Sequence, residues 1–147
     1  MPVLFEFGYG LSYTKFQYNA LTILKKSVNF EKVPSTPLFD VAFNICNVGN
    51  IVSDVSVLLF LSYQNEEKKD IGNTMEYPKR ELKYFKKLKD IKPVNQSDDE
   101  NDVRTIQFQL KQSDFELVDR NGKRKFTNGK WKIEVNHDSI LSSTFNI

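Results

Sequence analysis

The feature that most constrains the fold is an alternation of apolar and polar residues with a period of two. Between Phe39 and Ile45 the odd-numbered residues are apolar, and the residues between them are small or polar. The same spacing recurs at 55–63, 105–110, 131–135 and 140–147. Because successive side chains of a strand point to opposite faces, this period indicates β-strands with one buried face. The stretch 55–63 is also apolar at its intervening middle positions, which predicts a central strand.

Turn sequences separate these stretches. Asn47-Val48-Gly49-Asn50 ends the first of them, and Asn121-Gly122 and Asn128-Gly129 offer residues that tolerate the positive φ of tight hairpins. The second Asn-Gly pair leads directly into the stretch that begins at Trp131. Strands of this length with frequent turn signals predict an all-β sandwich of two antiparallel sheets, without a long helix.

One basic segment is ambiguous. Within 79–92 the apolar residues Leu82, Phe85, Leu88 and Ile91 recur every three residues among many lysines. This spacing is compatible with a basic amphipathic helix. It is equally compatible with a bulged edge strand whose lysines guard the edge against aggregation. The residues alone leave both structures open.

Composition excludes several classes of function. The chain has 147 residues, which suits one domain, and its 12 Phe and 6 Tyr favour β structure. A net charge of +2 does not call for nucleic acid or an anionic membrane as partner. Cys46 is the one cysteine, so an internal disulfide and a cysteine-based zinc site are excluded. No apolar run reaches the roughly 20 residues of a membrane span, and the first residues do not resemble a signal peptide.

Few residues suggest chemistry of their own. The acidic run Asp98-Asp99-Glu100-Asn101-Asp102 lies between polar residues and is interpreted as a solvated loop. His137, the one histidine, is interpreted as a surface residue. Asp119-x-Asn121-Gly122 resembles a fragment of a calcium loop, but a hairpin turn explains it better. Asn95-Gln96-Ser97 is a glycosylation sequon. We therefore expect no catalytic residue, no metal site and no cofactor in this chain.

The first residues are the most informative. Phe5-Glu6-Phe7-Gly8-Tyr9-Gly10-Leu11-Ser12-Tyr13-Thr14 places two glycines inside an aromatic run. Glycine allows a close approach of the backbone to another surface, and large aromatic side chains anchor such contacts. A dinucleotide site is excluded because Tyr13 replaces the third glycine of that motif. The residues predicted to pack against another domain are Phe5, Phe7, Gly8, Tyr9, Gly10, Leu11 and Tyr13.

These residues carry a resemblance to a known family. Phe7 to Thr14 resembles the segment that leads into the C-terminal fibronectin type III-like domain of family 3 glycoside hydrolases, which include β-glucosidases and β-xylosidases. Asn47 to Asn50, 78–88, Phe108 to Phe115 and 129–135 resemble later pieces of that domain in the same order. Tyr84 stands where the family has glycine, Trp131 where tyrosine is common, and the loop 93–102 replaces a tight turn.

The resemblance implies an immunoglobulin-like, fibronectin type III-like sandwich of about seven strands. It implies that 1–14 is a linker from an upstream catalytic domain, that 15–147 is the sandwich, and that the basic segment is a strand. It also implies that the catalytic residues lie outside this chain, in domains of the same polypeptide on which this one packs. Family members are often secreted, lysosomal or vacuolar, and the resemblance implies one of these locations by analogy alone.

Two alternatives stay open from the residues. The first is a free-standing module that binds carbohydrate or another polymer through exposed aromatic side chains. Its candidate residues are Tyr63, Tyr77, Tyr84 and Trp131. The second is an independent enzyme, which would have to assemble an acid and a base across loops.

Overall fold

The computed structural model describes residues 4, 7, 9–26, 34–64, 77–95, 103–119, 121–136 and 141–147. Within these residues the chain forms strands and one short 3₁₀ helix, so the prediction of an all-β fold is confirmed. The elements are β1 (Phe16–Lys25), β2 (Pro37–Asn47), β3 (Ser53–Tyr63), β4 (Glu81–Ile91), β5 (Arg104–Lys111), η1 (Gln112–Phe115), β6 (Glu116–Val118), β7 (Arg124–Phe126), β8 (Lys130–Val135) and β9 (Leu141–Asn146).

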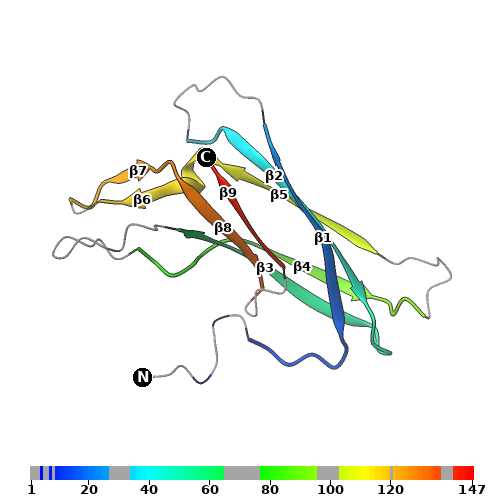
Figure 1. Cartoon of the computed structure of the whole chain (residues 1–147). Helices are drawn as coiled ribbons and strands as arrows, with labels where there is room; N and C mark the ends of the chain where they lie inside the picture. Colours follow the sequence, from blue (N-terminus) through cyan, green and yellow to red (C-terminus); the bar gives the residue numbers. More distant parts are fainter. Residues whose placement is uncertain are drawn as a thin grey trace.

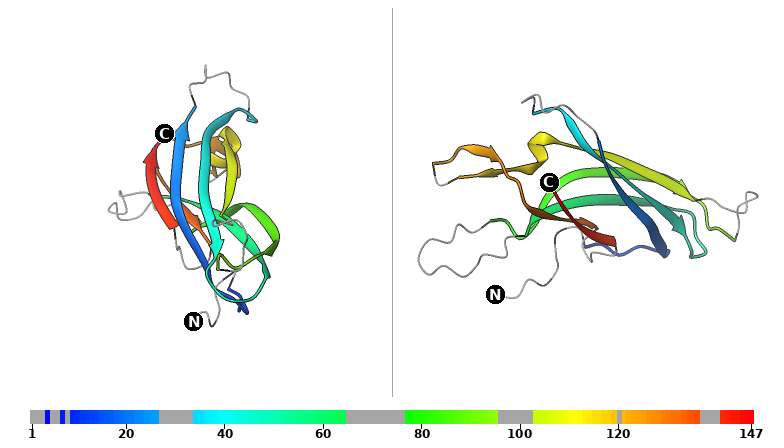
Figure 2. Two further views of the ribbon diagram at one scale, coloured as in Figure 1. Left: turned by 90° about the vertical axis from the view of Figure 1, so that its right-hand side faces the viewer. Right: turned by 45° about the horizontal axis from the view of Figure 1, so that its top comes forward.

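Two antiparallel sheets form the sandwich (Figure 1). One has three strands in the order β1-β2-β5, and the other has four in the order β4-β3-β8-β9. The strands β6 and β7 form a separate hairpin that projects from one end of the sandwich, as Figure 1 and the right-hand view of Figure 2 show. The seven strands of the two sheets match the expected number, and the hairpin is additional.

The strands predicted from alternation are all present. β3 lies between β4 and β8, so its interpretation as a central strand is correct. The ambiguous basic segment is β4, an edge strand whose pairing with β3 shifts between Ser53 and Val55 and again between Leu59 and Phe60. A bulged edge strand is therefore what forms, and the helix alternative is wrong. Tyr84 and Leu88 pack against the core, which fixes the register of this strand.

Three strands escaped prediction, and one turn was misassigned. The alternation of β1 is interrupted by a register shift between Asn19 and Thr22, where Ala20 has a φ of 57°. β6 and β7 have three residues each, too few for a periodic signal. The prediction of a hairpin at Asn128-Gly129 is wrong, because β7 and β8 belong to different sheets. Gly129 nonetheless has a positive φ of 133°.

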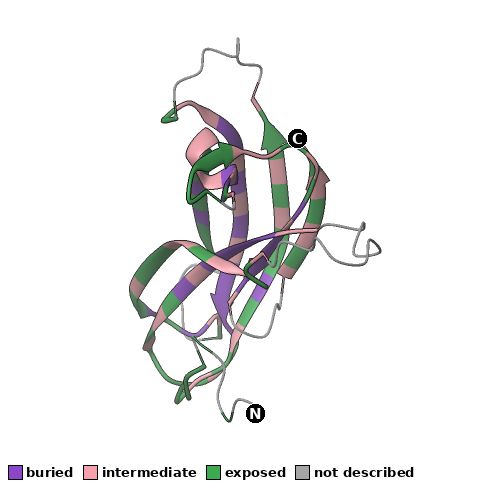
Figure 3. Ribbon diagram, turned by 90° about the vertical axis from the view of Figure 1, so that its left-hand side faces the viewer, coloured by how far each residue is buried: buried purple, intermediate pink, exposed green. Residues whose placement is uncertain are grey.

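The core lies between the two sheets. Phe43 from the three-stranded sheet and Leu59 and Ile133 from the four-stranded sheet are fully buried. Figure 3 shows buried positions, in purple, on strands of the sandwich. Trp131 lies 5.2 Å from Phe115, measured between ring centroids, so the end of the core is closed by aromatic side chains. Most of the aromatic residues that the structure describes thus pack within the domain.

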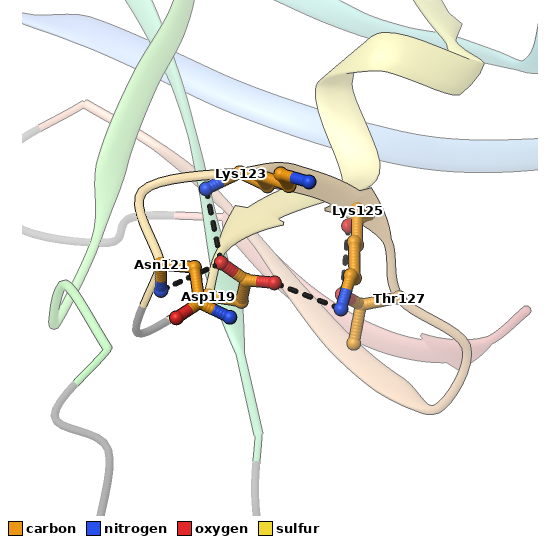
Figure 4. Close-up of polar contacts among 5 residues, drawn as sticks. All are labelled: Asp119, Asn121, Lys123, Lys125 and Thr127. Atoms are coloured by element: carbon orange, nitrogen blue, oxygen red, sulfur yellow. Dashed lines mark hydrogen bonds and ion pairs between the residues drawn. The ribbon is translucent and has the colours of Figure 1, made fainter.

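The turn between β6 and β7 is organised by one carboxylate (Figure 4). Oδ1 of Asp119 accepts hydrogen bonds from the backbone N–H groups of Asn121 and Lys123, both at 2.9 Å. Oδ2 lies 2.8 Å from Nζ of Lys125. The Lys125 ammonium, followed by the N–H groups of Lys123 and Asn121, holds the pKa of Asp119 below its ordinary value. Asp119-x-Asn121-Gly122 is therefore part of a hairpin turn, and both oxygens of the Asp119 carboxylate bind groups of this hairpin.

This hairpin should respond to acid at an unusually low pH. Because the pKa of Asp119 is lowered by folding, its stabilising contribution is present above the unfolded value of about 3.9 and is lost as pH falls through the folded pKa. We expect the amide chemical shifts of Asn121 and Lys123 to titrate with a midpoint below about 3.9. In Asp119→Asn, the matched control, this titration should vanish. A midpoint at or above the ordinary value in the wild type would contradict the account.

Candidate functional site

The leading segment, residues 1–14, carries the predicted packing residues. In the part that the structure describes, Phe7, Tyr9, Leu11 and Tyr13 are exposed, and so is Leu4. Leu11 and Tyr13 are 92% and 93% exposed, which leaves their side chains almost entirely in solvent. Phe5 and Gly8 lie outside the described residues. The segment therefore presents large apolar side chains that this chain itself does not bury.

Asn47 anchors the end of this segment to the sandwich. Its Oδ1 accepts hydrogen bonds from the Thr14 hydroxyl at 2.6 Å and from the Gly49 backbone N–H at 3.1 Å. Its Nδ2 donates to the backbone carbonyls of Ile51 at 2.8 Å and Ile91 at 2.9 Å. Asn47 is fully buried, and these four bonds use its full donor and acceptor capacity. One side chain thus joins the leading segment, the connection after β2 and the end of β4.

Gly49 makes room for the segment at the same place. A Cβ built on Gly49 would lie 2.8 Å from the backbone nitrogen of Lys15 and would also collide with the Thr14 side chain. The Val48 N–H donates to the Lys15 carbonyl at 2.8 Å, which holds the two backbones together. Glycine at position 49 is therefore required by the close approach of the leading segment.

Gly49→Ala should destabilise the isolated chain by about 1–3 kcal/mol, because the backbone at Lys15 must move to accommodate the methyl group. Urea unfolding followed by circular dichroism measures this change. Gly10→Ala is the matched control and should be nearly neutral, since a Cβ at Gly10 meets nothing within 4 Å. Equal stability of the two variants would contradict the role given to Gly49.

Phe7 shows where the segment passes. Its ring lies 6.3 Å from that of Phe60, centroid to centroid, with the two planes nearly perpendicular. The guanidinium carbon of Arg80 lies 4.7 Å from the centroid of the same Phe60 ring. Phe60 belongs to β3. The leading segment is therefore anchored at Thr14 and also contacts the four-stranded sheet through Phe7, seven residues earlier in the chain.

The aromatic side chains considered for carbohydrate stacking are engaged within the domain. Trp131 is buried, and its indole N–H donates to the Thr127 carbonyl at 3.1 Å. Tyr63 packs between Trp131 and Tyr77, with centroid distances of 5.3 Å to each. The Tyr84 hydroxyl donates to Oδ2 of Asp114 at 2.7 Å. Burial, followed by the Asp114 carboxylate, raises the pKa of Tyr84. Trp131 is thus buried, and the three tyrosines are half-buried.

A shallow groove of about 460 Å³ lies between the leading segment and the start of β3. Among the described residues that line it, Asp54 supplies a carboxylate and Lys15 an ammonium group. Asp54 accepts a hydrogen bond from the Asp90 N–H and pairs with Lys87 at 3.1 Å. The hydrogen bond from Asp90 and, to a smaller extent, the contact with Lys87 lower the pKa of Asp54. A general acid needs a raised pKa, so Asp54 is not suited to that role.

The remaining sequence candidates add no site to the described residues. The acidic run 98–102 and His137 lie outside them, as do Gln96 and Ser97 of the sequon. Among the described residues, no group of three or more His, Cys, Asp or Glu side chains is placed to hold a metal ion. No helix in the same residues is long and apolar enough to cross a membrane.

Asn47 is the residue whose role the sequence did not assign. The sequence Asn47-Val48-Gly49-Asn50 is typical of a turn, and its resemblance to the Asn-x-Gly turn of the family was the available signal. A turn explains an exposed asparagine, whereas this one is buried and bonded to a segment 33 residues away. The long-range contact depends on the fold and is invisible in local sequence.

Several known proteins are similar to this chain in sequence or in fold. No protein-family model matches the chain. Over 85 residues, which are 58% of this chain, it is 34% identical to thermostable β-glucosidase B of Acetivibrio thermocellus. It covers 10% of that relative, so it spans about a tenth of the relative's length.

Solved structures match nearly the whole chain. A β-glucosidase from Chaetomella raphigera matches 97% of this chain and 20% of its own, with a TM-score of 0.74 and 23% identity. The GH3 β-glucosidase of Bifidobacterium adolescentis matches 97% of this chain and 18% of its own, with a TM-score of 0.72 and 18% identity. The resemblance read from the sequence is thus confirmed, and this chain is similar in sequence and fold to a β-sandwich domain of family 3 glycoside hydrolases.

Proposed function

We propose that this chain is a non-catalytic accessory domain of a family 3 glycoside hydrolase, of the β-glucosidase or β-xylosidase type. Residues 1–14 form the linker to catalytic domains of the same polypeptide, and residues 15–147 form the fibronectin type III-like domain. The domain packs on those catalytic domains through the leading segment and stabilises them. The hydrolytic residues belong to the rest of the polypeptide.

The observation that carries this proposal is the combination of exposure and anchoring in the leading segment. Leu11 and Tyr13 are almost fully exposed, yet Thr14 is bonded to a buried asparagine directly after them. Large apolar side chains held at a fixed position and left in solvent are typical of a contact surface. Gly10 supports this, because neither its φ nor the space around it requires glycine within this chain. A surface that approaches closely would require it.

Co-purification with the remainder of its polypeptide tests the proposal. The tagged chain should retain the catalytic portion, and a variant carrying Leu11→Ser and Tyr13→Ser should retain at least tenfold less, as expected for the loss of central apolar anchors. Leu24→Ser is the matched control. Leu24 is an apolar residue that is 65% exposed, but it lies on β1 of the three-stranded sheet and outside the leading segment. Retention that is equal for both variants and the wild type would refute docking through the leading segment.

A further inference from the structure

The tripeptide Asn-Gly-Lys occurs at two places in the chain. Asn121-Gly122-Lys123 connects β6 to β7, and Asn128-Gly129-Lys130 leads into β8. An asparagine that precedes glycine loses ammonia spontaneously, because glycine has no Cβ to hinder attack by its backbone nitrogen on the asparagine side chain. Both asparagines are exposed, so access to solvent does not distinguish them. Since the two copies share their local sequence, a difference in reactivity between them has to come from the fold.

The loss of ammonia is a ring closure followed by hydrolysis. The backbone nitrogen of the glycine gives up its proton and forms a bond to Cγ of the asparagine. The bond from Cγ to the side-chain nitrogen breaks, and that nitrogen leaves as ammonia. Water then opens the cyclic imide at either of its carbonyl groups, which yields aspartate or isoaspartate. The folded structure controls the first of these steps through the hydrogen bonding of the glycine N–H.

In the first copy the glycine N–H is engaged. The Gly122 N–H donates a hydrogen bond to the Asp119 carbonyl at 2.9 Å. On either side of it, the N–H groups of Asn121 and Lys123 donate to Oδ1 of Asp119, both at 2.9 Å. The nitrogen of Gly122 must leave its acceptor before it can attack, and the turn must open with it.

In the second copy the glycine N–H has no acceptor. Among the residues that the structure describes, no group accepts a hydrogen bond from the Gly129 N–H, and the Asn128 side chain forms no hydrogen bond. The Tyr63 hydroxyl donates to the Asn128 carbonyl at 3.4 Å. This carbonyl belongs to the same peptide group as the Gly129 nitrogen, so the contact favours loss of the proton from that nitrogen.

We propose that Asn128 is a site of spontaneous deamidation and isoaspartate formation, and that the β6–β7 turn protects Asn121 from the same reaction. The proposal rests on the two glycine N–H groups, of which one is hydrogen-bonded and the other is not. It concerns the sandwich itself and is independent of the proposed function.

The modification falls beside the aromatic end of the core. On one side of Asn128, the Thr127 carbonyl accepts a hydrogen bond from the Trp131 indole at 3.1 Å. On the other side, the Gly129 carbonyl accepts one from the Ile147 N–H, also at 3.1 Å. Isoaspartate lengthens the backbone between these two contacts by one carbon atom and adds a carboxylate. Its formation therefore disturbs the packing of Trp131.

Incubation of the folded chain in mildly alkaline buffer tests the proposal. Samples are digested with pepsin at acid pH, which halts the reaction, and the peptides are quantified by mass spectrometry. Asn128 should react about fivefold faster than Asn121, the factor that one backbone hydrogen bond of typical strength supplies. Labelling by an isoaspartate methyltransferase should identify isoaspartate at position 128. In urea, where the sandwich is unfolded, the two rates should become equal.

Three outcomes would overturn the proposal. The first is an equal rate at both positions of the folded chain, or a faster reaction at Asn121. The second is a difference that persists in urea, because the fold would then not be its source. The third is a folded chain that reacts at neither position while the unfolded chain reacts at both.

Asn128→Gln is the matched variant, since glutamine keeps the amide but must close a larger ring and reacts far more slowly. During the incubation, the emission of Trp131 should shift to the red in the wild type, in proportion to the modified fraction. The emission of Asn128→Gln should stay unchanged. An equal shift in both proteins would overturn the link between this modification and the packing of Trp131.

Discussion

Asn47→Ala should lower the free energy of unfolding of the isolated chain by about 3 kcal/mol or more. The substitution leaves the carbonyls of Ile51 and Ile91 and the N–H of Gly49 without their partner. A buried polar group left without a hydrogen bond costs about 1–3 kcal/mol. Since small domains have a total stability of about 5–15 kcal/mol, this single change should remove a large part of it. Urea unfolding gives the value directly.

Two further variants show that hydrogen bonding is responsible. Asn47→Asp has nearly the same shape, but its second oxygen faces the carbonyls of Ile51 and Ile91 and repels them, so we expect no rescue. Asn44→Ala is the control in the same strand, because Oδ1 of Asn44 accepts an exposed hydrogen bond from the Thr105 hydroxyl at 3.0 Å. It should cost less than about 1 kcal/mol. Full stability in Asn47→Asp would contradict the account.

Loss of Asn47 should also release the leading segment. The Thr14 hydroxyl loses its acceptor, and the backbone bond from the Val48 N–H to the Lys15 carbonyl loses its nearest support. Trypsin should then cleave after Lys15 faster than in the wild type under conditions where the sandwich is still folded. A rate equal to that of the wild type would show that Asn47 stabilises the sandwich without positioning the segment.

Trp131→Ala should be comparably destabilising, by about 3–5 kcal/mol, as is usual for truncation of a buried tryptophan. The indole is 2% exposed, packs on Phe115 and Tyr63, and donates a hydrogen bond to Thr127. Thermal unfolding followed by circular dichroism measures the loss. Phe85→Ala is the matched control, since Phe85 is a large aromatic residue that is 72% exposed, and it should be nearly neutral in the isolated chain.

The same tryptophan offers a second test, because it is the one tryptophan of the chain. Its fluorescence in the wild type should be blue-shifted and resistant to quenching by iodide or acrylamide. Oligosaccharides and cell-wall polymers should leave this emission unchanged. Emission typical of exposed indole, with a shift on adding a saccharide, would contradict the structure and favour a carbohydrate-binding module.

The main strands of the two sheets could be predicted because their faces differ in polarity. Side chains alternate between more and less exposed along β5 and β9, and along part of β2, β3 and β8, and the sequence shows this alternation directly. β1 was missed because the bulge at Ala20 shifts its alternation by changing which residues face the core. β4 was ambiguous because two shifts in its pairing with β3 and a row of lysines give its apolar residues a spacing of three.

Less of the candidate site than of the fold could be predicted from the sequence. The aromatic residues and glycines of the leading segment are local, so they could be recognised. Their anchor depends on Asn47 and Gly49, which become neighbours of Thr14 only when β1 and β2 pair. The position of Phe85 on the sheet likewise depends on the register that sets it opposite Leu58. Contacts between strands determine these features, and no single segment encodes them.

The most direct test of the central claim is the rate at which glycosidase activity is lost on heating, with and without this chain. The measurement compares the intact polypeptide, the catalytic portion alone, and that portion supplemented with the separate chain, all on an aryl-glycoside substrate. The account predicts that the separate chain is inactive by itself, that the catalytic portion alone inactivates faster, and that adding the chain restores its lifetime. Hydrolysis by the separate chain, or a lifetime that the chain does not change, would contradict it.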